Sequence, residues 1–152
     1  GSLRDYIWIN GGSPKITGNL FLPIKGHGIV IDPQKYGHPE VQNNEFQIPG
    51  KNAVYFLNGG EKTPPLISNN FFAAGDIQLP CNSRALILRN HIKSNLVFSK
   101  SGNCIGKFYV GENYWESFDS KKILQQRIVG REPQFEVYLQ GILYESPITD
   151  GK

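Results

Sequence analysis

The chain has 152 residues, and we expect one domain over residues 1–152, with Gly1-Ser2 interpreted as a cloning remnant. Its 17 Gly and 10 Pro predict frequent turns, and its 9 Phe, 7 Tyr and 2 Trp exclude a disordered chain. The formal net charge of +3 permits nucleic-acid binding without indicating it. No apolar run approaches the length of a transmembrane helix, so we expect no membrane partner.

Short runs typical of strands follow one another along the chain and are separated by turn residues. The expected strands, in chain order, cover residues 6–9, 20–22, 29–31, 45–48, 53–57, 77–79, 85–88, 96–98, 135–139 and 142–144. Residues 66–74 are ambiguous, and residues 105–109 fit a short helix or a strand. We detect no internal repeat. Many short strands with one or two helices are typical of a β-barrel or a β-sandwich.

One segment has the pattern of a helix. Asp119 or Ser120 can cap its N-terminus, and Ile123, Leu124 and Ile128 fall near one face. We expect the basic side chains of this segment to lie on its exposed side.

Cys81 and Cys104 are the only cysteines, and no histidine accompanies them at zinc-ligand spacing. We therefore predict no metal site and no cofactor. Two free thiols in a reducing cytoplasm are the simpler interpretation, and a disulfide is the alternative.

No complete catalytic motif is present. Asp119-Ser120-Lys121 has the acid-x-Lys spacing of some nucleases, but it lies at an expected helix start, where Asp and Ser are ordinary caps. His91-Ile92-Lys93 matches the first half of the phospholipase-D-type motif, whose aspartate is replaced by Phe98. We therefore predict a chain without catalytic residues, which acts by binding.

Two polar clusters are candidates for reading DNA bases, because Arg and Lys bind guanine edges while Asn and Gln bind adenine. The first lies in a long connection and contains Lys25, His27, Lys35, Tyr36, His38, Gln42, Asn43 and Asn44. The second contains Arg89, Asn90, His91, Lys93 and Asn95. Candidate phosphate contacts are Lys100, Lys121, Lys122, Arg127 and Arg131. The alternative is that both clusters are ordinary polar loops.

Several fragments, in order, resemble the B3-like DNA-recognition domain of certain restriction endonucleases. Leu22-Pro23-Ile24 resembles the family's L-P-L segment, and Asn44-Glu45-Phe46-Gln47-Ile48-Pro49 resembles its N-E-A-Y-x-x-P strand. Residues 105–109 and 129–138 resemble its L-G-x-Y-F-R and Y-G-R-x-x-x-x-F-Y segments. The family's arm motif, G-L-N-W-G-Q-R, is absent, so base contacts are not transferred one by one.

The resemblance implies a mainly β fold, a seven-stranded open pseudobarrel with one or two short helices. It also implies sequence-specific recognition of double-stranded DNA, with two polar arms in the major groove. In that case the chain is a non-catalytic part of a restriction endonuclease, with the nuclease domain elsewhere in the parent protein.

The alternative function is that of a β-sandwich carbohydrate-binding module or a viral or phage surface module. Aromatic side chains stack on sugar rings, and Trp8, Tyr36, Tyr114 and Trp115 are the candidates. A third alternative is a purely structural interaction domain.

Overall fold

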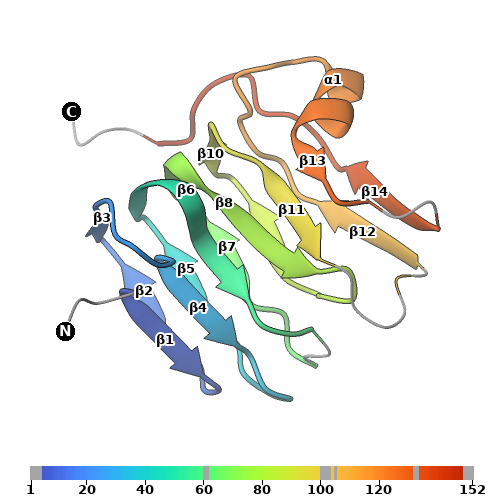
Figure 1. The fold of residues 1–152 in the computed structure, drawn as a ribbon. Helices are drawn as coiled ribbons and strands as arrows, with labels where there is room; N and C mark the ends of the chain where they lie inside the picture. Colours follow the sequence, from blue (N-terminus) through green and yellow to red (C-terminus); the bar gives the residue numbers. More distant parts are fainter. Residues whose placement is uncertain (1–4, 60–61, 100–103, 105, 132–133, 149–152) are drawn as a thin grey trace.

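The computed structural model describes residues 5–59, 62–99, 104, 106–131 and 134–148. The chain winds into a parallel β-solenoid of about five turns, which we call rungs (Figure 1). Every strand pair is parallel, because each rung returns the chain to the same starting edge and runs in the same direction as the rung before it.

Three sheets form the walls of the solenoid. The largest has the order β1-β4-β6-β8-β11-β13, and β3 and β10 pair with β6 and β8. Its strands are β1 (Ile7–Asn10), β3 (Leu20–Phe21), β4 (Ile29–Asp32), β6 (Glu45–Phe56), β8 (Phe71–Pro80), β10 (His91–Ile92), β11 (Leu96–Ser99) and β13 (Ile128–Val129). The second sheet contains β2 (Lys15–Thr17), β5 (Glu40–Gln42), β7 (Leu66–Ser68) and β9 (Leu86–Leu88). The third pairs β12 (Gly106–Val110) with β14 (Phe135–Leu139).

An asparagine ladder joins the rungs at the corner that follows each strand of the second sheet and, in the last rung, β12. Its members are Asn19, Asn44, Asn70, Asn90 and Asn113. The backbone N and the Nδ2 of each ladder asparagine donate to the Oδ1 of the ladder asparagine in the next rung along the chain, at 3.0–3.1 Å. The ladder therefore satisfies polar groups inside the wall.

The residue before each of the first four ladder asparagines lies in the left-handed region, with φ between 54° and 73°. These residues are Gly18, Asn43, Asn69 and Arg89, and Gly and Asn adopt this conformation with the least strain.

Stacked apolar side chains fill the solenoid. Ile16, Val41, Ile67 and Ile87 occupy equivalent positions on successive strands of the second sheet. Facing them, the rings of Phe21, Phe46 and Phe72 lie parallel, with centroids 4.6 and 4.9 Å apart. Each fully buried side chain of this kind contributes about 1.5–3 kcal/mol to folding.

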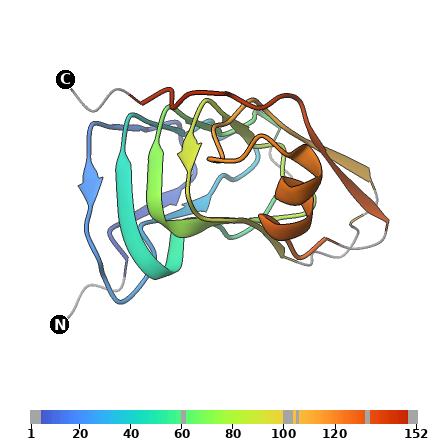
Figure 2. The same ribbon diagram turned by 90° about the horizontal axis from the view of Figure 1, so that it is seen from above.

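The C-terminal rung is covered by a helix. α1 (Ser120–Gln126) begins at Asp119, whose side chain accepts a bond from the Lys122 backbone N, so the predicted helix and cap are confirmed. Ile123 is its buried residue, as predicted. In both views the last segment returns along the solenoid towards the N-terminal rungs (Figures 1 and 2). Within the described residues, no helix has both the length and the apolar character required to span a bilayer.

The predicted seven-stranded open pseudobarrel is wrong. The turn residues mark corners between walls instead of hairpin turns, and each strand pairs with a strand one rung further along the chain. For example, the sequence predicts residues 85–88 and 96–98 to be hairpin partners, but they do not pair, because β9 lies in the second sheet and β11 in the first. Residues 45–56 form one bent strand, β6, which continues through Pro49-Gly50, where the sequence predicts a turn between two strands.

Candidate functional site

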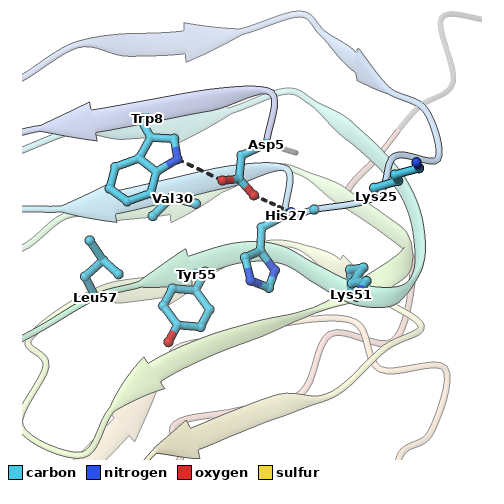
Figure 3. A pocket seen from close by; sticks show the side chains of 9 residues that line it. Asp5, Trp8, Lys25, His27, Val30, Lys51, Tyr55 and Leu57 are labelled. Carbon is cyan, nitrogen blue, oxygen red and sulfur yellow. Dashed lines mark hydrogen bonds between the residues drawn. The ribbon is translucent and has the colours of Figure 1, made fainter. Parts of the chain in front are cut away.

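A pocket of about 500 Å³ lies on the outer face of the largest sheet, near its N-terminal edge (Figure 3). Three rungs contribute to it, through β1, the start of β4, and β6. Its lining comprises Asp5, Trp8, Lys25, Gly26, His27, Val30, Lys51, Tyr55 and Leu57. The register of the sheet brings these residues together, because Trp8 is the partner of Val30 and Val30 is the partner of Tyr55.

Trp8 is the most exposed aromatic side chain of the pocket, with 60% of its surface accessible. It points outward because alternate residues of β1 face solvent and its neighbour Ile9 faces the core. Its indole Nε1 donates a hydrogen bond to Asp5 Oδ2 at 2.8 Å, which fixes the plane of the ring. The pocket therefore has an oriented aromatic surface that is not used in the core.

His27 forms the centre of the pocket, between Trp8 and the lysines (Figure 3). Its ring stacks on Tyr55, with centroids 4.8 Å apart and an angle of 21° between the planes. The Asn52 backbone N donates to His27 Nδ1 at 3.2 Å, so the neutral ring carries its proton on Nε2. Burial lowers the pKa of His27, the Asp5 carboxylate opposes this, and Lys51 lowers it further.

Gly28 allows the close approach that forms this corner. A Cβ at this position would lie 2.5 Å from the backbone O of Ala53, so a larger residue would push β4 away from β6. The Asp5 Oδ1 atom accepts a bond from the His27 backbone N at 2.7 Å and ties the chain before β1 to the same corner.

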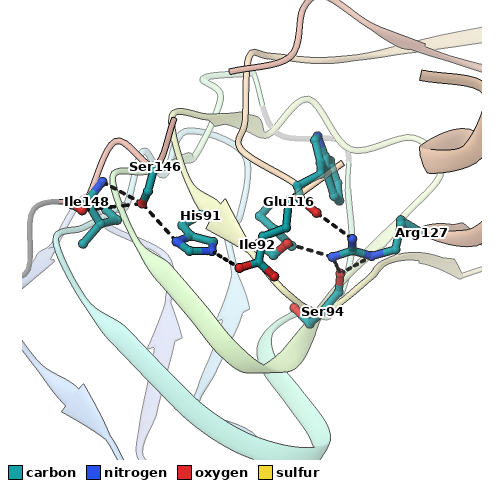
Figure 4. Close-up of polar contacts among 8 residues, drawn as sticks. His91, Ile92, Ser94, Glu116, Arg127, Ser146 and Ile148 are labelled. Atoms are coloured by element: carbon teal, nitrogen blue, oxygen red, sulfur yellow. Dashed lines mark hydrogen bonds and ion pairs between the residues drawn. The ribbon is translucent and has the colours of Figure 1, made fainter. Parts of the chain in front are cut away.

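A second polar cluster lies at the ladder corner of the C-terminal rungs (Figure 4). His91 Nε2 is 3.0 Å from Glu116 Oε2, and His91 Nδ1 is 3.0 Å from Ser146 Oγ. Both ring nitrogens are thereby engaged, and the contact with Ser146 holds the returning C-terminal segment against the solenoid.

A smaller hollow of about 350 Å³ lies between this returning segment and the turns of the first three rungs. Asn43, Asn44, Phe71 and Ile148 are among its lining residues.

The structure distributes the predicted base-reading residues over three corners of the rungs. Lys25 and His27 line the pocket described above, whereas Lys35, Tyr36 and His38 lie in the loop between β4 and β5. Six of the remaining candidates lie at or near the ladder corner, and these are Gln42, Asn43, Asn44, Arg89, Asn90 and His91. Lys93 and Asn95 lie in the turn between β10 and β11. The two polar clusters that were predicted to read DNA bases therefore do not converge as two arms.

Two of the predicted base-reading residues are unavailable to a ligand. Asn44 and Asn90 are 4% and 0% exposed, and their amides bond within the ladder and to backbone oxygens. Their assignment as base-reading residues is wrong, because these asparagines satisfy the interior of the wall.

Arg127, a predicted phosphate contact, is half-buried and is engaged within the chain. Its guanidinium donates to the backbone oxygens of Ile92, Ser94 and Trp115 and lies 5.4 Å from the centre of the Trp115 ring (Figure 4). Burial lowers the pKa of Arg127, whereas Glu116 and Asp76 raise it. Lys121, Lys122 and Arg131 are exposed, and Lys100 lies outside the described residues.

The aromatic candidates for sugar binding differ in how exposed their side chains are. Trp115 is completely buried, so its assignment is wrong, whereas Trp8 and Tyr36 are 60% and 67% exposed. Tyr114 is half-buried and contacts His91 edge to face. Sequence reasoning missed Asp5, Lys51 and Tyr55 as pocket residues, since only the rung register brings them beside Trp8.

The cysteines form a disulfide, Cys81–Cys104, so the prediction of free thiols is wrong. Among the described residues, no three His, Cys, Asp or Glu side chains gather as a metal site. Comparisons with protein-family models, with curated proteins and with solved structures found no match for this chain.

Proposed function

We propose that this chain is a non-catalytic polysaccharide-binding domain and that the pocket around Trp8 holds a sugar ring. The observation that carries the proposal is the exposed indole of Trp8, oriented by Asp5 at the edge of a preformed hollow. The C–H groups of a sugar ring pack against an aromatic face, and fixing that face in advance reduces the entropy lost on binding.

The rest of the pocket suits the hydroxyl groups of a sugar. The Lys25 and Lys51 ammonium groups and the neutral His27 ring supply polar hydrogen atoms around the aromatic surface. A preformed hollow with an aromatic side and a few polar groups is the usual form of a small-ligand site.

The DNA-binding prediction receives less support. Its two arms required a barrel, and the residues assigned to them lie at three separate corners. Binding of double-stranded DNA as part of a larger endonuclease remains a prediction, and it forms one arm of the experiment below.

The disulfide bears on where such binding would take place. Disulfides persist mainly in oxidising compartments, so Cys81–Cys104 favours an extracytoplasmic location over the cytoplasmic one that was predicted. Polysaccharides of cell surfaces and matrices are accessible there.

The experiment is affinity electrophoresis of the chain through gels containing a panel of neutral and acidic polysaccharides. We expect retardation by at least one polymer, and we expect Trp8→Ala to weaken that binding by about tenfold or more. Tyr36→Ala is the matched control, because Tyr36 is an equally exposed aromatic residue outside the pocket.

Two outcomes would overturn the proposal. One is that no polymer retards the chain, and the other is that Trp8→Ala and Tyr36→Ala have the same effect. A randomised DNA duplex pool, tested in parallel at about 50 and 200 mM salt, examines the DNA prediction. Enrichment of one short motif there would favour DNA recognition over glycan binding.

A further inference from the structure

We infer that the sugar held at Trp8 belongs to an acidic polysaccharide and that Lys25 and Lys51 bind its negative charge. This inference rests on the proposed function and names its ligand class. It starts from the arrangement of side chains in the pocket, which has an apolar end and a cationic end (Figure 3).

The two ends are built by different parts of the same rungs. Trp8 and Leu57 lie at one end, Lys25 and Lys51 lie at the other, and His27 with Tyr55 lies between them (Figure 3). Lys25 comes from the turn before β4, and Lys51 comes from the bend of β6, so both are placed by the corner that Gly28 allows to close. Both lysines are exposed.

The charges of the lining residues favour an anion. Lys25 and Lys51 carry two positive charges, and among the described lining residues Asp5 is the one carboxylate. Both Asp5 oxygens accept hydrogen bonds, from Trp8 Nε1 and from the His27 backbone N, and this reduces their capacity to repel a ligand. The cationic end therefore presents a net attraction for a negatively charged group.

The pocket is wide enough across the rungs to hold a sugar ring. Trp8 and Tyr55 lie two rungs apart, and with a rung spacing of about 4.8 Å the pocket extends about 10 Å along the solenoid axis. A ring stacked at the Trp8 end can direct an acidic substituent towards the lysines. An ammonium group is a point charge without the planar fork of Arg, so a carboxylate or a sulfate ester satisfies the same chemistry.

The experiment compares polymers that differ only in charge. Polygalacturonate, alginate and hyaluronan are each measured against their carboxyl-reduced forms, which keep the backbone and lose the negative charge, and dextran sulfate is measured against dextran. We expect the chain to bind at least one acidic polymer about tenfold or more tightly than its neutral counterpart. The preferred pair identifies carboxylate or sulfate as the group bound.

A charge-matched pair of variants tests the assignment to the lysines. Lys25→Gln with Lys51→Gln should lose about tenfold in affinity for the acidic polymer and little for the neutral one. Lys121→Gln with Lys122→Gln removes the same charge from the exposed face of α1 and should change either affinity by less than about twofold. Circular dichroism confirms that all four substitutions leave the fold intact.

The outcomes separate this inference from the proposed function. If Trp8→Ala weakens binding while acidic and neutral forms bind equally, the chain binds glycans and the inference of an acidic ligand is overturned. If the helix variant loses as much affinity as the pocket variant, net charge is responsible and the assignment to Lys25 and Lys51 is overturned. If Trp8→Ala has no effect on any polymer, the proposed function itself is overturned.

Discussion

His27 couples the pocket to pH, because its folded environment favours the neutral ring. Burial lowers the pKa of His27, and protonation of Nδ1 would also remove the hydrogen bond from the Asn52 backbone N. The unfolded chain therefore binds a proton at a higher pH than the folded chain does. As the pH falls below the pKa of His27 in the unfolded chain, about 6.5, the free energy of unfolding decreases. This decrease ends once the pH is below the pKa of His27 in the folded chain.

We predict that His27→Phe reduces this pH dependence. Phe keeps a ring against Tyr55 but does not titrate, so the fall in stability between about pH 8 and about pH 5.5 should be smaller in the variant. Urea denaturation at both pH values measures the two free energies of unfolding. His38 and His91 are present in both proteins, so their contributions cancel. An identical fall in the two proteins would show that His27 keeps its unfolded pKa.

The pocket could be only partly predicted from the sequence at this scale. Lys25 and His27 were named because they lie in a polar segment, and Trp8 was named because aromatic residues bind sugars. Lys51 and Tyr55 carry no local signal, since nothing in residues 51–55 distinguishes an outward pocket position from an ordinary strand. Asn44 and Asn90 were misassigned because a polar side chain in a turn-rich segment normally faces solvent, whereas here the ladder buries it.

At the scale of elements, Arg127 joins the end of α1 to the two preceding rungs. The residue follows the helix directly, and its guanidinium donates to the backbone oxygens of Ile92, Ser94 and Trp115. Ile92 is the last residue of β10, Ser94 lies in the turn between β10 and β11, and Trp115 directly follows the isolated bridge residue Tyr114. The side chain thus replaces strand pairing as the partner of these acceptors.

We predict that Arg127→Lys lowers the free energy of unfolding by roughly 2 kcal/mol or more, because a single ammonium group cannot reach all three acceptors. Arg131→Lys is the control, since Arg131 is exposed and should change stability by less than about 0.5 kcal/mol. Chemical denaturation followed by circular dichroism measures both. Equal stabilities for the two variants would show that Arg127 is not required to hold α1 against the two preceding rungs.

The elements themselves were largely predictable, but their pairing was not. Short apolar runs correctly placed strands near β1, β4, β9 and β11, alternation correctly placed β14, and Asp119 correctly marked the start of α1. Turn residues such as Asn10-Gly11-Gly12 were interpreted as turns that close single strands of a barrel or sandwich. The same residue types also form the corners of a solenoid, because both kinds of turn need left-handed backbone conformations.

At the scale of the whole molecule, the sequence contains one short repeat for each rung of the solenoid, although no internal repeat was predicted. The segments Ile16-Thr17-Gly18-Asn19-Leu20-Phe21, Val41-Gln42-Asn43-Asn44-Glu45-Phe46 and Ile67-Ser68-Asn69-Asn70-Phe71-Phe72 share one pattern, and residues 87–92 and 110–115 continue it. Asn is its one invariant letter, flanked by inward apolar positions three residues before and two residues after. The spacing between successive asparagines varies from 20 to 26, so no fixed period exists to be found.

The ladder explains why this short repeat is sufficient for a solenoid. Each rung contacts mainly its two neighbours, so stability depends on the interfaces between successive rungs. Asn70 is the middle member of the ladder. Its Nδ2 donates to Val41 O in the previous rung and to Asn90 Oδ1 in the next rung along the chain. Asn19 is at the exposed end and has a ladder partner on one side.

We therefore predict that Asn70→Ala lowers the free energy of unfolding by about 3 kcal/mol, since it removes the bonds that the Asn70 amide makes inside the wall to the backbone N of Asn44 and the backbone O of Val41. Asn19→Ala is the matched control and should cost less than about 1 kcal/mol, because its site is open to water. Urea denaturation of both variants measures the difference. Similar losses at the two positions would mean that strand pairing alone couples the rungs and that the ladder adds little to the stability of the solenoid.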